Sequence, residues 1–198
     1  MKRVVLGITG ASGAPYAARA LHFFAGAGRE AGIEAEVVFT RNGRLVWSHE
    51  VGGDPAHYGL PIWPSGDMTA PFASGSARYD GMVVLPCSAG TLGRIATGVS
   101  ADLVGRAADV MLKERRPLIL VLRETPLSLI HVRNMEQLIL AGATILPAAP
   151  SFYSRPASME ALLDTVVARA LDALGIENTL MARWRGLAPA HNPVKESS

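Results

Sequence analysis

Short apolar runs alternate along this chain with longer segments in which apolar residues recur at helical spacing. Such runs are typical of strands that a parallel sheet buries on both faces. We expect strands at residues 3–9, 34–40, 81–86, 118–123 and 143–148. We expect helices at about 14–31, 43–49, 102–115, 129–142 and 159–174, and another after the turn at 87–93. This alternation predicts an α/β fold with an open parallel sheet.

The turn after the first strand contains Gly10, Ser12 and Gly13, and Pro15 follows it. Glycines let the backbone approach a ligand closely, and the free N–H groups of a helix start attract an anion. We therefore expect a nucleotide or flavin phosphate here, with Ser12 adding a hydroxyl. The spacing Gly7-x-x-Gly10-x-x-Gly13 differs from the G-x-G-x-x-G of dinucleotide-binding proteins, and no Gly-Lys-Ser/Thr follows. A tight turn without a ligand is the alternative.

A second strand-to-helix turn, at residues 87–93, is also made of small and hydroxyl residues. Loops at the carboxyl ends of adjacent parallel strands converge on one crevice, so we expect the two turns to form one site. Thr40 and Arg41 end the second strand, where a nicotinamide-binding domain carries an acid. Arg41 leaves an NADP 2′-phosphate site open as an alternative. Cys87 is interpreted as a small buried filler.

Charged residues follow the fourth strand and one of the helices. Arg123 and Glu124 come at a carboxyl strand end, where an acid beside a ligand can move protons, and a local ion pair is the alternative. Arg106 and Lys113 lie seven positions apart and therefore share one helical face. From the sequence pattern alone, a solvated helix face and a functional role both stay open for these two residues.

Other polar segments have structural explanations. Arg115 and Arg116 are interpreted as a solvated helix end that compensates the helix dipole. His131 is interpreted as a structural hydrogen-bonding residue. The Gly- and Pro-rich stretch at 52–76 is long for a loop, which is typical of a functional loop or an interface arm. The tail from about residue 186 is expected to be mobile.

Composition narrows the class of protein. A length of 198 residues, with 49% hydrophobic and 18% charged residues, fits one globular domain spanning 1–198. The high hydrophobic share favours an oligomer. A net charge of +2 argues against a nucleic-acid partner. The single cysteine fits a cytoplasmic protein, and the N-terminal apolar run is too short for a signal peptide or a membrane span.

Several motifs together resemble the flavin prenyltransferases, the UbiX-like family formerly described as phenylacrylic acid or 3-octaprenyl-4-hydroxybenzoate decarboxylases. They read GITGASGA, PCSAGTL, RAADVMLKERRPLIL, RETPLSLIH, GATILPAAPSFY and ARW, and they span Val4 to Trp184. The resemblance implies a flavodoxin-like Rossmann three-layer fold. It also implies a dodecamer with active sites between subunits.

The resemblance further implies a reaction. Reduced FMN is alkylated at N5 by dimethylallyl monophosphate, and the prenyl carbon then closes onto C6. The product, prenylated FMN, serves a separate UbiD-like decarboxylase. The chain has no adjacent aspartates and no DDxxD motif, which fits a metal-free reaction with a monophosphate donor.

Residue roles are implied in the same way. The residues implied to bind FMN are Gly10, Ala11, Ser12, Thr40, Ser88, Ala89, Gly90, Thr91 and Arg123. Those implied to surround the prenyl phosphate are Arg106, Lys113, Tyr153 and Arg169. Glu124 is implied to relay protons, with Ser12 assisting. Met68 stands where some members carry an aromatic residue near the prenyl group, which implies a different prenyl pocket or a slower rate.

Two other functions stay open. An FMN-dependent cysteine-type decarboxylase of the same superfamily would carry an asparagine in a PASANT-like motif, but this chain has Gly90 there and no Met-Asn substrate motif. A non-catalytic flavin carrier is the second alternative. A carrier would not need the residues implied to bind the prenyl phosphate, so their joint presence favours catalysis.

Overall fold

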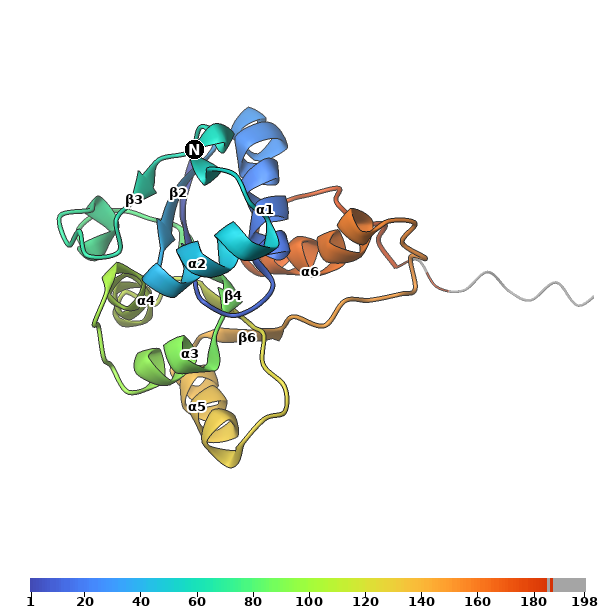
Figure 1. Ribbon diagram of the computed structural model, residues 1–198. Helices are drawn as coiled ribbons and strands as arrows, with labels where there is room; N and C mark the ends of the chain where they lie inside the picture. Colours follow the sequence, from blue (N-terminus) through green and yellow to red (C-terminus); the bar gives the residue numbers. More distant parts are fainter. Residues whose placement is uncertain (185, 187–198) are drawn as a thin grey trace, which may run out of the picture.

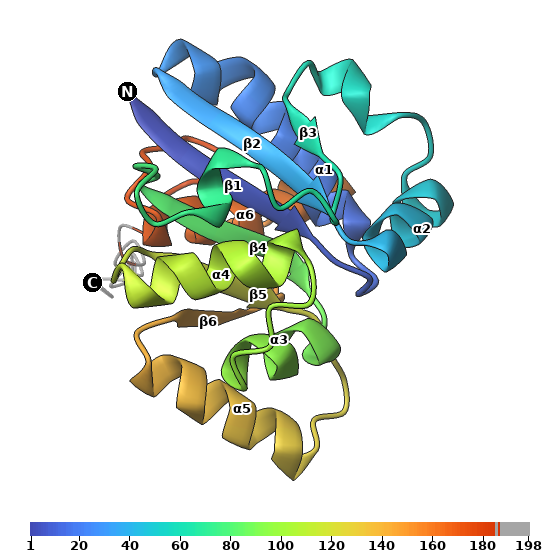
Figure 2. The same ribbon diagram turned by 90° about the vertical axis from the view of Figure 1, so that its left-hand side faces the viewer.

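The computed structural model describes residues 1–184 and 186. The predicted mobile tail therefore lies, apart from Gly186, outside the described residues. The described strands form one parallel sheet in the order β3-β2-β1-β4-β5-β6 (Figure 1 and Figure 2). They are β1 Lys2–Ile8, β2 Ile33–Phe39, β3 Ile62–Trp63, β4 Gly81–Cys87, β5 Leu118–Leu122 and β6 Thr144–Pro147. The longer strands lie where the sequence predicts them, and the very short β3 adds an edge strand that the sequence analysis missed.

Helices cover both faces of this sheet. They are α1 Ala14–Phe23, α2 Arg41–Glu50, α3 Ala89–Ala96, α4 Leu103–Lys113, α5 Leu129–Leu140 and α6 Met159–Ala173. Figure 2 shows α1 and α6 behind the sheet and α3, α4 and α5 in front of it. Without β3, the strand order is that of the flavodoxin-like fold, so the predicted three-layer fold is confirmed. None of the described helices has the length and apolar character needed to cross a bilayer.

The apolar runs reflect burial on both sides. In β1, Val4, Leu6 and Ile8 join the core beneath α1 and α6, whereas Val5 joins the core beneath α3 and α4. All of them are at most 1% exposed. Because neighbouring side chains of a strand point to opposite faces, a strand covered on both faces reads as continuously apolar.

The first helix is shorter than the sequence predicts. Regular α-helix ends at Phe23, and a π-helical turn, Phe24–Gly28, follows, in which Gly26 has non-helical angles (φ −104°, ψ −107°). A Cβ on Gly28 would lie 3.1 Å from the carbonyl oxygen of Phe23. The glycines therefore allow a tight irregular turn that the apolar periodicity does not reveal.

The long loop before β4 is bound to α4. The amide of Leu103 donates to the carbonyl of Ser65 at 2.7 Å. Arg116 donates through Nη1 to Ala77 O at 2.8 Å and through Nη2 to Gly75 O at 2.9 Å. The solvated helix end predicted for Arg116 is therefore wrong, because its guanidinium satisfies loop carbonyls; Arg115 is exposed as predicted.

Other structural interpretations are confirmed. The Nδ1 atom of His131 accepts from the Ser128 amide at 3.2 Å, and Ser128 Oγ accepts from the His131 amide at 3.3 Å. The pair forms a capping box at the start of α5. His131 thus has a structural role at a helix terminus.

Cys87 is inaccessible at the end of β4, with 0% exposure, and burial raises the pKa of its thiol to about 12. Since the thiolate is the reactive form, we expect almost no labelling by a disulfide reagent in the folded protein at about pH 8. One thiol per chain should react after unfolding. Fast labelling of the folded protein would show that the end of β4 opens readily.

Candidate functional site

The candidate site lies at the point of the sheet where the chain reverses the direction in which it adds strands, between β1 and β4. From β1 the chain proceeds to β2 on one side, and it later returns to place β4 on the other side of β1. Ligands of open α/β sheets bind at the carboxyl ends of strands at such a point. Thr9 joins the two strand ends, since its Oγ1 donates to Pro86 O at 2.7 Å and accepts from the Ser88 amide at 2.9 Å. The two turns therefore converge as predicted.

Arg123 brings a third loop to this crevice. Its Nε donates to Ser12 O at 2.8 Å, and its amide donates to Cys87 O at 3.0 Å. The alternative of a local ion pair is wrong for the described residues, in which Arg123 forms no salt bridge with Glu124. The exposed Glu124 carboxylate instead accepts from the Thr125 amide at 3.1 Å.

The second turn places the start of α3 in the crevice. Ser88 is the N-cap, and its Oγ accepts from the Thr91 amide at 3.2 Å and donates to Thr91 Oγ1 at 3.0 Å. Ala89 and Thr91 are buried, whereas Gly90 is exposed. A Cβ on Gly90 would have its nearest neighbour, Arg94 Nη1, 3.8 Å away. The backbone at Gly90 is therefore accessible to a ligand.

The start of α2 packs closely against the end of β1 and the first turn. A Cβ on Gly10 would lie 2.4 Å from Asn42 Cβ, and a Cβ on Gly43 would lie 2.3 Å from Ile8 O. Thr40 is the N-cap of α2, and its Oγ1 accepts from the Gly43 amide at 3.0 Å. Gly10 and Thr40, both implied to bind FMN, are thus held close together by the packing of α2 on the first turn.

Glu50, at the end of α2, is a residue of this site that the sequence analysis missed. Its Oε2 accepts from the amides of Gly13 and Ala14, both at 2.8 Å, at the start of α1. Burial alone would raise the pKa of this carboxyl. Hydrogen bonds from the Ser12 hydroxyl and the two amides, together with the charge of Arg123, outweigh that effect and lower the pKa.

The first turn therefore differs from the prediction of an external anion at the start of α1. These α1 amides already have an internal carboxylate as their acceptor. Nothing in the sequence around Glu50 marks it, because the partners lie 36 and 37 positions away and meet it only through the fold.

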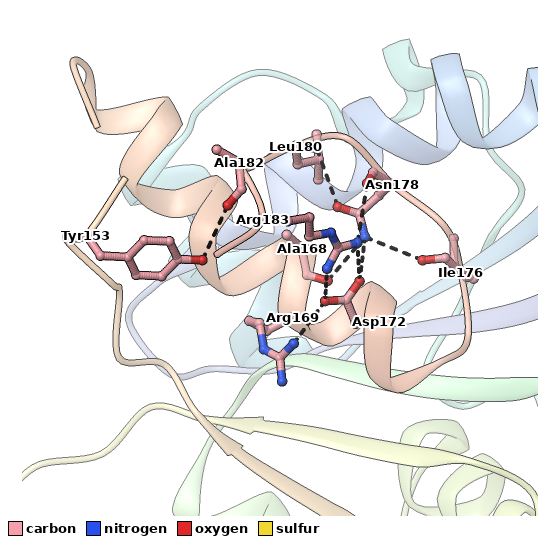
Figure 3. A network of polar contacts seen from close by, with 9 residues as sticks. All are labelled: Tyr153, Ala168, Arg169, Asp172, Ile176, Asn178, Leu180, Ala182 and Arg183. Atoms are coloured by element: carbon pink, nitrogen blue, oxygen red, sulfur yellow. Dashed lines mark hydrogen bonds and ion pairs between the residues drawn. The ribbon is translucent and has the colours of Figure 1, made fainter. Parts of the chain in front are cut away.

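Two of the residues implied to bind the prenyl phosphate lie elsewhere. Tyr153 and Arg169 line a cavity of about 620 Å³ between β6, α6 and the segment at residues 181–184. In Figure 3, Tyr153 approaches from the loop after β6 and Arg169 from α6. Arg169 pairs with Asp172 at 3.0 Å.

The other two lie on the opposite face of the sheet. Arg106, on α4, donates through Nε to Ala73 O at 2.9 Å and pairs with Asp109 at 2.8 Å. Lys113 pairs with Glu114 at 2.8 Å. Met68 is 46% exposed on the loop that covers α4. Since α4 and α6 cover different faces, one chain does not gather these residues into one pocket.

Comparison with known proteins identifies the family. A family model described as Flavoprotein matches residues 1–172. The flavin prenyltransferase UbiX of Synechocystis sp. is 45% identical to this chain, in an alignment that covers 92% of this chain and 96% of the relative. This chain belongs to the flavin prenyltransferase family.

Solved structures of UbiX-like proteins have the same fold as this chain. AnUbiX (PadA1), in complex with FMN and dimethylallyl pyrophosphate, matches with a TM-score of 0.89 and 40% identity, over 94% of this chain and 99% of the other. A dodecameric FMN-dependent UbiX-like decarboxylase from Escherichia coli O157:H7 matches with a TM-score of 0.87 and 38% identity, over 93% and 100%. Flavin prenyltransferases thus share this chain's fold nearly end to end.

Among residues 1–184 and 186, no group of three or more His, Cys, Asp or Glu side chains is arranged to hold a metal ion.

Proposed function

We propose that this chain is a flavin prenyltransferase acting as a single flavin-binding domain. It would transfer a dimethylallyl group from dimethylallyl monophosphate to N5 and C6 of reduced FMN, and the prenylated FMN would serve a UbiD-like decarboxylase. The observation that carries the proposal is the similarity, over 94% of this chain, to a structure that contains both FMN and a dimethylallyl phosphate ester.

The crevice fits FMN chemically. Among the described residues, Arg123 uses only Nε of its guanidinium in a hydrogen bond, so its terminal nitrogens are available to an anion. The backbone at Gly90 is open, and the start of α3 adds amides that favour negative charge. Because Glu50 occupies the start of α1, we infer that the FMN phosphate relies on other donors of the crevice. Reduced FMN supplies the nucleophilic flavin atoms.

The prenyl donor needs cations that stabilise its leaving phosphate, and preorganised donors are the most effective way to provide them. Arg106, Lys113 and Arg169 supply the charge, and Tyr153 supplies a hydroxyl. Because one chain holds them on two faces, we propose that different copies combine them into each site. Metal ions are not required in this scheme.

The exposed apolar surface supports such an assembly. On α5, Leu129, Ile130 and Leu140 are 64%, 70% and 81% exposed, and Leu138 is the helix's buried residue. A face this apolar marks an interaction site. The Escherichia coli relative is a dodecamer, and we propose the same assembly here. A cytoplasmic location is proposed from the single buried thiol.

Proton movement is assigned to Glu124, with Ser12 assisting. We expect Ser12→Ala to lower kcat about 10-fold, less than loss of a proton-transferring carboxylate, because the Ser12 hydroxyl is proposed only to assist the proton movement of Glu124. FMN affinity should change little, and Ser48→Ala on the exposed side of α2 is the matched control. Steady-state rates and FMN titrations measure both quantities. Loss of FMN binding would reassign Ser12 to a binding role.

The proposed function is tested by the mass of the flavin. The purified protein is mixed anaerobically with reduced FMN and dimethylallyl monophosphate, with and without a chelator. The molecular mass of the released flavin is then measured by mass spectrometry. A gain of one C5 prenyl unit is expected in both samples. Dimethylallyl pyrophosphate is tested in parallel, because the relative's structure contains that donor.

The same experiment addresses the alternatives. Unmodified FMN that stays bound would favour a flavin carrier or a cysteine-type decarboxylase. Loss of carbon dioxide from a peptide with a C-terminal cysteine would identify the decarboxylase. Gly90 in place of the asparagine of those enzymes argues against that outcome.

A further inference from the structure

Asp172, near the end of α6, is the centre of a polar network beside the cavity that Tyr153 and Arg169 line. Its carboxylate accepts from Arg183 through Nη1 at 2.6 Å and Nη2 at 2.8 Å, and from Asn178 Nδ2 at 3.0 Å. Arg169 Nη1 approaches the same carboxylate at 3.0 Å (Figure 3). These contacts lower the pKa of Asp172, with the Arg183 hydrogen bonds the largest cause.

This carboxylate is better fixed than those of most surface ion pairs. Its side chain is 19% exposed, whereas that of Arg169 is 65% exposed. An isolated pair at that exposure contributes little, because solvent screens it and two long side chains lose freedom. Here the two-point contact with Arg183 and the Asn178 amide already hold Asp172. Arg169 therefore pairs with an acceptor whose position is set independently.

Arg183 also connects the network to the segment at residues 181–184. Tyr153 Oη donates to Ala182 O in that segment at 3.3 Å. The Tyr153 ring also packs edge-to-face on Trp184, with 5.4 Å between ring centroids. Arg169 and Tyr153, two residues of the proposed prenyl-phosphate site, are thus attached to one segment, Arg169 through Asp172 and Tyr153 directly.

We infer that Asp172 is a positioning residue, which holds Arg169 ready for the donor phosphate and couples it to the 181–184 segment. The inference rests on the proposed function of Arg169. One carboxylate between two guanidinium groups leaves the cluster net positive, so the attraction for a phosphate persists. What Asp172 adds is order, because an arginine that is already oriented loses less freedom when it binds an anion.

The test compares Asp172→Asn with the unchanged protein, both as the FMN-loaded oligomer. Asparagine keeps the size of the side chain and one oxygen acceptor but removes the charge. Dimethylallyl monophosphate is titrated onto protein with oxidised FMN, in which no turnover occurs. We expect its Kd to rise about 3- to 10-fold, the effect of one long side chain losing its preorganisation. FMN affinity should not change.

Turnover with reduced FMN adds a second readout. The KM for the donor should rise by a similar factor, with a smaller change in kcat and none in the KM for FMN. Glu177→Gln is the matched control, because it removes one nearby exposed charge that makes no hydrogen bond or ion pair within the described part of the chain. Asp172→Glu should recover part of the affinity.

A double mutant shows whether Asp172 acts through Arg169. If it does, Asp172→Asn adds no further loss to Arg169→Gln. Additive losses would overturn the inference, as would an Asp172→Asn variant that binds the donor as well as the Glu177→Gln control or more tightly. If the unchanged protein binds the donor but forms no prenylated flavin, the proposed function fails while the binding comparison still decides the role of Asp172.

Discussion

Glu124→Gln is expected to lower kcat for prenyl transfer by about 100- to 10,000-fold, the usual contribution of a proton-transferring side chain. Glu124 directly follows Arg123, whose Nε donates to Ser12 O at 2.8 Å. That contact fixes the loop after β5 at the crevice, and we propose that the exposed Glu124 carboxylate reaches the flavin there. Glutamine has the same size and keeps an oxygen for the Thr125 amide, but it accepts no proton at neutral pH.

Binding and chemistry should therefore separate in this variant. FMN affinity is expected to stay within about twofold of the original. The hydrogen bond from Arg123 Nε to Ser12 O does not involve the Glu124 side chain, so the substitution leaves it in place. Single-turnover formation of prenylated FMN, followed by mass under anaerobic conditions, gives the rate. Glu30→Gln, at an exposed helical position shortly before β2, is the control for loss of one carboxylate. Unchanged turnover would remove Glu124 from the mechanism.

The second large effect is expected from Gly43→Ala in the first turn of α2. On helix propensity alone, alanine would stabilise the protein by about 0.8–1.0 kcal/mol. However, the new Cβ would lie 2.3 Å from Ile8 O and 3.0 Å from Ile8 C, which are backbone atoms of β1. Overpacking of this kind costs about 1–3 kcal/mol, and here a strand or a helix has to move to relieve it. We expect the clash to prevail.

Displacement of α2 should also affect the flavin. Thr40 caps this helix at the Gly43 amide, and Gly10 contacts Asn42. We expect Gly43→Ala to lower the free energy of unfolding and to weaken FMN binding together. Denaturant unfolding and FMN titration measure the two effects. Gly66→Ala is the control, because no atom lies within 4 Å of its added Cβ. Equal stability of the two variants would mean that α2 adjusts without cost.

Local sequence predicts much of this fold because its strands are covered on both faces. The runs at β1, β4 and β5 are buried along nearly their whole length, so their composition alone identifies them. The short strand β3 was not predicted, because two residues are too few to show an alternating pattern. The prediction that the first helix continues to residue 31 was wrong, because the regular helix is interrupted at Gly26. The departure from helical angles is local there and leaves the apolar pattern of the sequence intact.

The residues of the candidate site also differ in whether local sequence could predict them. Gly10, Ser88 and Arg123 were found because turns and strand ends of a parallel sheet have a fixed relation to its crevice. Their FMN contacts stay predictions. Glu50 was missed because its partners are far away in sequence. Arg116 was misinterpreted because a charged helix end looks the same whether it meets water or the carbonyls of Gly75 and Ala77.

The sequence by itself determined the fold class, the family and the chemical types at the crevice, because burial periodicity and short motifs are local properties. Only the tertiary structure showed that Glu50 fills the start of α1 and that Asp172 joins Arg169 to Arg183. It also placed Arg106 and Arg169 on different faces of the sheet. Such contacts depend on how distant segments pack, and packing is set by the whole chain.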